Sequence, residues 1–208
     1  MHEKSYQLKP ITGDKREECL SKIIIKNEVF DAEYHWPTLC RVLDANKHLF
    51  KNEYFMKSQT IKEFAGRTIP FKLLDSQNKI RFTFKSYMNI CRFLGQHLIH
   101  EYTKELHFPD NTELTFWNPG DSMSLHADNC WQENAPDHIK EMDHPTGFRD
   151  YSAIFYLNDD YEGGEINFPN FDLTIKPEKG SAVFFPAGLK HSHSVSEVKG
   201  KKRITIAV

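Results

Sequence analysis

The chain has 208 residues, with 27 Lys and Arg against 29 Asp and Glu and a formal net charge of −2 at pH 7. This length predicts one domain, because single β-sandwiches and barrels commonly run to about 200–250 residues. The near-neutral charge provides no basic field that would concentrate nucleic acid or an anionic membrane, so we expect neither as a partner. Hydrophobic residues make up 39% of the chain, which is too many for a disordered protein and predicts a folded core.

Two features of the sequence bear on the compartment. The polar segment 1–10 lacks the apolar stretch of a secretory signal, and no run of about 18 apolar residues could form a membrane-spanning helix. The four cysteines are scattered without a C-x-x-C pair, so we interpret them as reduced thiols rather than zinc ligands or disulfides. We therefore expect a soluble, cytoplasmic protein, and its oligomeric state stays open.

The first half of the chain has the pattern of a helical region. Asp14 and Glu17 resemble a capping box and precede apolar residues at helical spacing, which predicts a helix that reaches Ile24. Residues 66–79 are rich in turn formers and are expected to form a loop or a short hairpin. Further helices are predicted over residues 37–49, 52–64 and 83–106, the last with an apolar stripe that indicates packing against a sheet.

The second half of the chain alternates short β-forming runs with Gly, Pro and Asn turn signals. Eight such runs predict a β-sandwich or barrel. They cover residues 114–117, 122–127, 151–157, 165–168, 173–176, 182–185, 192–195 and 203–208.

One insertion, residues 129–150, interrupts this rhythm. It is long for a structureless connection, and such loops are often functional lids, although a disordered surface insertion is an equally good interpretation. Trp131 and Arg149 are the substrate contacts we would guess in it. Five acidic residues favour a basic or peptide substrate, while a solvated lid explains them more simply.

A His-x-Asp pair closes the predicted strand 122–127. His126 and Asp128 are two residues apart, so in a strand their side chains project to the same face. Such a pair is common by chance and needs a third partner, for which His191 and His193 are the candidates. Two His and one carboxylate form the facial triad of non-haem Fe(II) oxygenases, whereas a closed zinc site requires four protein ligands.

A cation follows this possible triad on the last predicted strand. Arg203 lies ten residues after His193, and an Arg fork matches the two oxygens of a carboxylate, such as the far end of a dicarboxylate that chelates iron. The alternative is a solvated basic tail, and Lys201 is the reserve candidate for the same role because it shares a strand face with Arg203.

Several motifs in residues 112–208 occur together in a recognisable order. They are Trp117-Asn118-Pro119-Gly120, His126-Ala127-Asp128-Asn129, Tyr156-Leu157-Asn158-Asp159, Gly163-Gly164-Glu165, Phe168-Pro169, Pro177-Glu178-Lys179-Gly180, Phe184-Phe185, His193-Ser194-Val195 and Arg203. With these motifs the segment resembles the prolyl-4-hydroxylase-like branch of the 2-oxoglutarate and Fe(II)-dependent dioxygenases. The resemblance implies an α+β, mainly β fold: a double-stranded β-helix of the jelly-roll or cupin-like type with an N-terminal helical layer. Residues 1–208 would then be one oxygenase domain, with a helical support over 1–111 and the core over 112–208.

The same resemblance implies the roles of the site residues. The iron ligands would be His126, Asp128 and His193. Arg203 would pair with the distal carboxylate of 2-oxoglutarate, with Tyr156 as a hydroxyl donor and Thr205 as a weaker candidate. Fe(II), 2-oxoglutarate as cosubstrate, dioxygen and also ascorbate are the cofactors that the resemblance suggests. The expected reaction is hydroxylation of a C–H bond of an amino-acid, peptidyl (prolyl-like) or small-molecule substrate, with succinate and carbon dioxide as co-products.

Two alternatives to this assignment stay open. His191 falls at a spacing similar to the second metal motif of cupins, so a cupin-type metal dioxygenase or isomerase could use it without 2-oxoglutarate. We prefer His193, because its distance to Arg203 matches the family and His191 would need two extra residues. His191 would then be a group beside the ligands or facing the substrate. A non-enzymatic β-helix binding domain is the third possibility.

Overall fold

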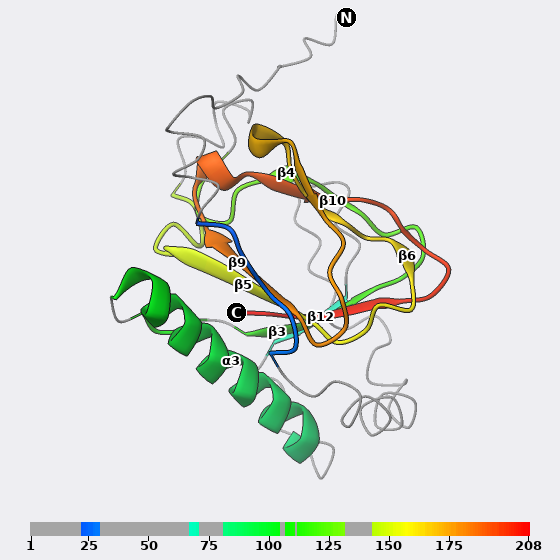
Figure 1. Cartoon of the computed structure of the whole chain (residues 1–208), viewed down its shortest axis with the longest axis horizontal. Coiled ribbons are helices and arrows are strands. Elements are labelled where there is room, and N and C mark those ends of the chain that lie inside the picture. The colour runs from blue at the N-terminus through cyan, green and yellow to red at the C-terminus, as the bar shows by residue number, and fades with distance from the viewer. Residues whose placement is uncertain (1–21, 30–66, 71–80, 105–106, 111, 132–142) are drawn as a thin grey trace, which may run out of the picture.

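The computed structural model describes residues 22–29, 67–70, 81–104, 107–110, 112–131 and 143–208 (Figure 1). The helices expected over residues 37–49 and 52–64, the capping box and the central part of the insertion lie outside these residues. None of the helices in the described part is both long and apolar enough to cross a membrane.

Two antiparallel sheets face each other (Figure 1). The larger has the strand order β1-β9-β5-β12-β3-β2, and the smaller has the order β4-β10-β7-β8. The larger sheet consists of β1 (Ile24–Lys26), β9 (Ala182–Pro186), β5 (Tyr151–Tyr156), β12 (Arg203–Ala207), β3 (Glu113–Trp117) and β2 (Arg67–Pro70). The smaller one consists of β4 (Met123–His126), β10 (His193–Val195), β7 (Ile166–Phe168) and β8 (Leu173–Ile175). A further pair, β6 (Glu162–Gly163) and β11 (Val198–Lys199), and two 3-10 turns, η3 (Pro169–Phe171) and η4 (Leu189–His191), complete the described elements.

The helix α3 (Arg81–Thr103) covers the outer face of the larger sheet (Figure 1). Its buried residues Cys91 and Leu98 pack in one cluster with Phe155 of β5, while Phe93 on another side of the helix is 69% exposed. Burial raises the pKa of the Cys91 thiol, so this cysteine is an inert core residue. The helix predicted over residues 83–106, and its packing against a sheet, are confirmed.

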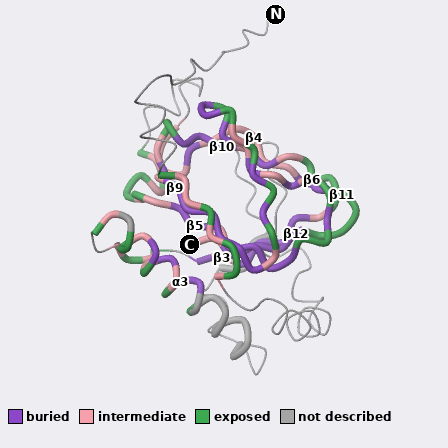
Figure 2. Tube along the Cα trace, in the orientation of Figure 1, coloured by how far each residue is buried: buried purple, intermediate pink, exposed green. Residues whose placement is uncertain are grey.

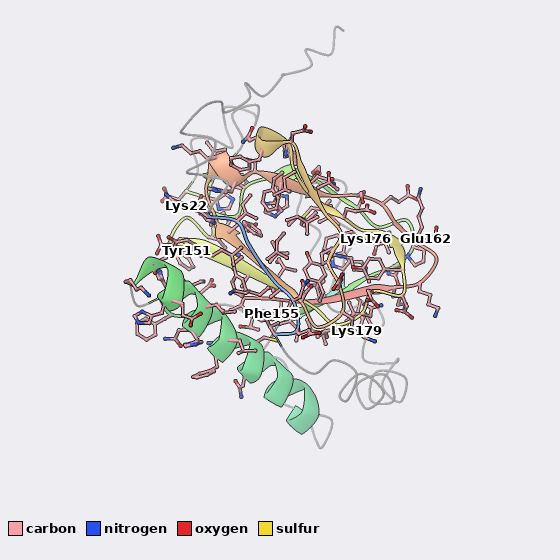
Figure 3. The ribbon with its side chains drawn as sticks, viewed as in Figure 1. Lys22, Tyr151, Phe155, Glu162, Lys176 and Lys179 are labelled. Carbon is pink, nitrogen blue, oxygen red and sulfur yellow. The ribbon has the colours of Figure 1, made fainter. Side chains whose placement is uncertain are left out.

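In the larger sheet, successive side chains of a strand point alternately toward α3 and toward the smaller sheet. Figure 2 shows how far the residues are buried. In β5, Ala153 and Phe155 face α3, whereas Ile154 and Tyr156 face the smaller sheet, as the two-residue period of a strand requires. Figure 3 shows Tyr151 and Phe155 along this strand. The same parity turns Trp117, Val183, Phe185, Arg203 and Thr205 toward the interior.

All eight strands predicted for the second half of the chain are present. The structure corrects two predictions for the first half. The helix expected to reach Ile24 is wrong there, because Ile24–Lys26 is the strand β1, paired with β9. Ile23 packs between the sheets and Ile24 packs under α3, which is the alternation of a strand. Three β-branched residues fit an edge strand, and pairing with β9 decides the conformation. Arg67–Pro70, in the segment expected to be a loop or hairpin, forms β2 beside β3.

Candidate active site

Three side chains converge at the open end of the smaller sheet. His126 ends β4 and His193 begins β10, and the two residues are direct cross-strand partners with ring centroids 4.3 Å apart. Asp128 follows β4 and brings Oδ1 to 3.4 Å from Nε2 of His126. One ligand atom from each residue lies within 4.8 Å of the others, which makes this the one cluster of possible metal ligands in the described part of the chain. His126 and Asp128 therefore point to the same side, as predicted, and His193 lies beside them there.

Each member of this cluster is held by a second hydrogen bond. His126 donates from Nδ1 to the carbonyl oxygen of Ser124 at 2.9 Å, and His193 donates from Nδ1 to that of His191 at 3.2 Å. His193 therefore keeps its Nε2 lone pair available, whereas Nε2 of His126 faces the Asp128 carboxylate. Ser152 donates from Oγ to Oδ2 of Asp128 at 2.5 Å, which leaves Oδ1 facing the imidazoles. Such outer partners fix the tautomer and orientation of metal ligands.

The electrostatics of the cluster suit a cation. Burial alone would raise the pKa of Asp128, but the two imidazoles and the Ser152 hydroxyl outweigh it and hold that pKa well below its usual range. Burial and the neighbouring His126 lower the pKa of His193 to about 4. Burial also acts to lower the pKa of His126, but the hydrogen bond and charge of Asp128 leave it raised. At neutral pH the carboxylate is ionised and His193 is neutral, the forms in which these groups bind metals.

The donor set fits a non-haem Fe(II) ion. Two imidazole nitrogens and one carboxylate oxygen are the facial triad that leaves further coordination positions open. Phe185 lies 4.6 Å and Phe168 5.5 Å from the His193 ring between centroids, so one side of the cluster is apolar. An apolar shell limits solvent access to a metal. Among the described residues the cluster offers three protein donors, one fewer than a structural zinc site requires.

A buried cation lies deeper between the sheets. Arg203 is 2% exposed, and its guanidinium carbon lies 4.7 Å from the Trp117 ring centroid and 5.1 Å from that of Tyr156. The strand register explains this, because β12 pairs Arg203 with Trp117 and Thr205 with Tyr156. Trp117 donates from Nε1 to Oγ1 of Thr205 at 3.3 Å, which leaves the Thr205 hydroxyl proton available.

The Arg203 guanidinium lacks the acceptors that a buried cation requires. Its Nη2 approaches the Tyr156 hydroxyl at 3.5 Å, but Nε and Nη1 are buried with no hydrogen-bond partner in the described structure. Burial raises the pKa of Tyr156 despite the opposing effect of Arg203, so the phenol stays protonated and can donate. The pocket therefore offers donors and a positive charge to an anion. The solvated-tail alternative is wrong for Arg203, whereas Lys201 is exposed and pairs with Asp160 at 3.0 Å.

The three substrate-side guesses lie outside this arrangement of ligands and cation. Arg149 pairs with Asp110 at 3.2 Å, and Trp131 contacts the ring of His144 at 4.4 Å between centroids. His191 is buried against Phe171, and it meets the cluster through its carbonyl oxygen. Contact with a substrate therefore stays a prediction for all three.

The sequence analysis missed two residues that shape the site. Ser152 holds Asp128, and strand parity could have identified it, because it lies on the same face of β5 as Tyr156. Gly164 has φ +67°, and a Cβ there would lie 2.9 Å from Cδ of Arg203. Gly163-Gly164-Glu165 is part of the resemblance, which was stated without giving Gly164 a role, and the structure shows that this glycine makes room for the cation.

The fold and the site together define a class. Two facing antiparallel sheets that bring two His and one Asp to a common point form a β-barrel of the 2-His-1-carboxylate type. A family model described as the 2OG-Fe(II) oxygenase superfamily matches residues 112–208. Over these residues the chain is similar to that superfamily, and the predicted resemblance is confirmed.

Several relatives and solved structures are similar to this chain. Human prolyl 3-hydroxylase 2 is 37% identical over 92 residues, and chicken prolyl 3-hydroxylase 1 is 40% identical over 93 residues, each match covering 42% of this chain. The match spans only 13% of the length of these relatives.

Among solved structures, a prolyl hydroxylase from Trichoplax adhaerens in complex with a hypoxia inducible factor peptide fragment has a TM-score of 0.64 at 13% identity, over 92% of this chain and 84% of that one. A prolyl-4-hydroxylase from Pseudomonas putida has a TM-score of 0.59 at 17% identity, over 92% and 94% of the two chains. At such identities the likeness establishes the fold, and the expected double-stranded β-helix is confirmed.

Proposed function

We propose that the chain is an Fe(II)- and 2-oxoglutarate-dependent dioxygenase that hydroxylates a C–H bond. The proposal rests on one observation: the metal-ligand cluster and Arg203 face the same interior between the sheets. In the described structure, Nε and Nη1 of Arg203 have no hydrogen-bond partner there. His193 contacts Phe185, Phe185 belongs to the same buried cluster as Tyr156, and Tyr156 contacts the guanidinium. A ligand that binds a metal at one end and carries a carboxylate at the other fits this arrangement.

Each residue has a distinct task in this proposal. His126, Asp128 and His193 hold Fe(II), while Arg203 binds the distal carboxylate of 2-oxoglutarate with hydroxyl donors from Tyr156 and Thr205. Fe(II), 2-oxoglutarate and dioxygen together supply the conversion of C–H to C–OH, with succinate and carbon dioxide as co-products and ascorbate to keep the metal reduced. The protein contributes ligand geometry, a dry interior and fixed orientation of the cosubstrate.

The substrate class that we favour is a peptidyl prolyl-like residue. The support comes from the names of the similar proteins, which are prolyl hydroxylases, one of them solved with a peptide fragment. A free amino acid or a small molecule is the alternative. The single-domain organisation, with 112–208 as the core and 1–111 as its support, belongs to the same proposal.

The test is succinate formation by purified protein supplied with Fe(II), 2-oxoglutarate and ascorbate, with and without proline-containing peptides. Wild-type protein should form succinate, and a substrate peptide should raise the rate. His126→Ala and Asp128→Ala should each abolish turnover, because either change removes a metal ligand. His97→Ala is the matched control, since His97 is an exposed residue of α3.

The outcomes separate the alternatives. Succinate formation at the wild-type rate in both ligand variants would contradict the proposal. Turnover that depends on the metal and on His191 without any 2-oxoglutarate would favour the cupin-type enzyme. Purified protein that takes up no Fe(II) would favour the non-enzymatic binding domain.

A further inference from the structure

A third aromatic side chain borders the Arg203 pocket. Tyr161 is 5% exposed and packs with Trp117, Val195 and Val198 in a small buried cluster. Its hydroxyl oxygen is buried and has no hydrogen-bond partner in the described part of the structure. The next residue, Glu162, lies at the β6 edge of the barrel, away from α3 (Figure 3). A buried phenol without a partner is less stable than a satisfied one, so its position requires an explanation.

Tyr161 and Arg203 are neighbours. The missing side chain of Gly164 makes room for both, because a Cβ there would lie 2.9 Å from Cδ of Arg203 and 3.0 Å from Cε2 of Tyr161. Burial raises the pKa of Tyr161 to about 12, although the charge of Arg203 opposes the change. The phenol therefore keeps its proton at neutral pH and can donate it to an incoming acceptor.

Among the described residues, each unsatisfied group of the pocket can donate a hydrogen bond. These groups are the Tyr161 hydroxyl and the Nε and Nη1 groups of Arg203, joined by the available hydroxyl proton of Thr205. A carboxylate has two oxygens with about four lone-pair sites and one negative charge, so it matches both the donors and the cation. A water molecule could accept some of these hydrogen bonds but would leave the guanidinium charge unpaired.

We infer that the Tyr161 hydroxyl is an additional cosubstrate-binding group, which donates to the same carboxylate as Arg203. The inference rests on the proposed function, and it makes Tyr161 a second phenol in the pocket beside Tyr156. Tyr161 acts at the distal carboxylate alone, remote from the metal-chelating end. This location gives it a testable signature that a structural role would not produce.

The test compares two ligands in equilibrium titrations of Mn(II)-loaded protein, which requires no turnover. The first is 2-oxoglutarate, and the second is 2-oxobutyrate, which keeps the chelating end and lacks the distal carboxylate. Tyr161→Phe removes one oxygen atom and should weaken 2-oxoglutarate binding about tenfold to a hundredfold, the range for a hydrogen bond to a charged group. Binding of 2-oxobutyrate should change by less than about twofold.

The affinity ratio of the two ligands makes the outcome independent of the fraction of folded protein. An unchanged ratio in Tyr161→Phe overturns the inference, whether both ligands bind as in the wild type or both bind more weakly. If wild-type protein binds Mn(II) but not 2-oxoglutarate, the proposed function fails and the inference fails with it. Tyr156→Phe is the reference variant, since its hydroxyl contacts Nη2 of Arg203.

Discussion

Replacing Arg203 with methionine should change binding and stability in different ways. The methionine fills most of the space between the Trp117 and Tyr156 rings, and its thioether packs well against aromatic groups. It removes a buried charge with two unpaired nitrogens, Nε and Nη1. We therefore expect the ligand-free variant to be about as stable as the wild type and to have lost its affinity for 2-oxoglutarate.

The magnitude follows from the contacts of the guanidinium. Removing two unsatisfied donors recovers about 1–3 kcal/mol each. Losing the cation–π contacts with Trp117 and Tyr156 costs about 2 kcal/mol each at a desolvated site. The free energy of unfolding of Arg203→Met should thus stay within about 2 kcal/mol of the wild type. An arginine with a buried carboxylate partner would behave otherwise, because breaking such a pair costs about 3–5 kcal/mol.

Thermal and denaturant unfolding of metal-loaded protein, with and without 2-oxoglutarate, measures both effects. A ligand at a hundred times its Kd stabilises the wild type by about 2.7 kcal/mol. This corresponds to a rise in Tm of about 5–10 °C for a chain of this size. Arg203→Met should show no such rise.

Arg149→Met is the matched control. Arg149 pairs with Asp110 and is partly exposed, so its loss should change the unfolding free energy by less than about 1 kcal/mol and leave the ligand effect intact. Arg203→Met protein that loses more than about 3 kcal/mol without ligand, yet still responds fully to 2-oxoglutarate, would refute the reasoning. Such a result would make Arg203 a structural cation rather than a binding group.

Three further outcomes are expected. Ser152→Ala should weaken Mn(II) affinity about 10–100-fold in a chelator-competition titration, because Oδ2 of Asp128 loses its donor; unchanged affinity would contradict a positioning role. Gly163→Ala should lower the unfolding free energy by more than about 2 kcal/mol, since its Cβ would collide with a backbone carbonyl beside β11, whereas Gly200→Ala, at a similar φ with open space, should cost less. His191→Gln should leave metal content within about twofold of the wild type, and a complete loss would transfer a ligand role to that residue.

Strand alternation explains how much of the fold the sequence could predict. Four predicted strands belong to the larger sheet, β3, β5, β9 and β12, and their residues alternate between the α3 side and the interior, so the two-residue period is present in their sequence. The strand β1 has three residues, and a run of isoleucines fits a helix or a strand equally well until β9 is beside it. The two-residue strands β6 and β11 depend on each other and on Gly163, which leaves no local periodic signal.

Local sequence patterns predicted part of the site, and the pairing register between distant strands determined the rest. His126 and Asp128 share a face by local parity alone. His191 and His193 share parity as well, so alternation could not choose between them. The turn η4 ends at His191, and β10 begins at His193 opposite His126, which brings His193 to the cluster. This choice depends on pairing between strands far apart in the sequence, and only the family resemblance had favoured it.

Arg203 departs from the pattern of the rest of the barrel, because two of its buried nitrogens have no hydrogen-bond partner in the described structure. Around it, inward and outward residues follow strand parity, and its neighbour Thr205 accepts a hydrogen bond from Trp117. Sequences that satisfy local propensity, packing and hydrogen bonding everywhere else tend to violate those rules where function requires it. Nε and Nη1 of Arg203 and the Tyr161 hydroxyl, all buried without a partner among the described residues, cost stability in the free protein. Because these buried groups lie close together between the sheets, a single anionic ligand can accept hydrogen bonds from both residues. The metal-ligand cluster in the same interior can hold the other end of that ligand.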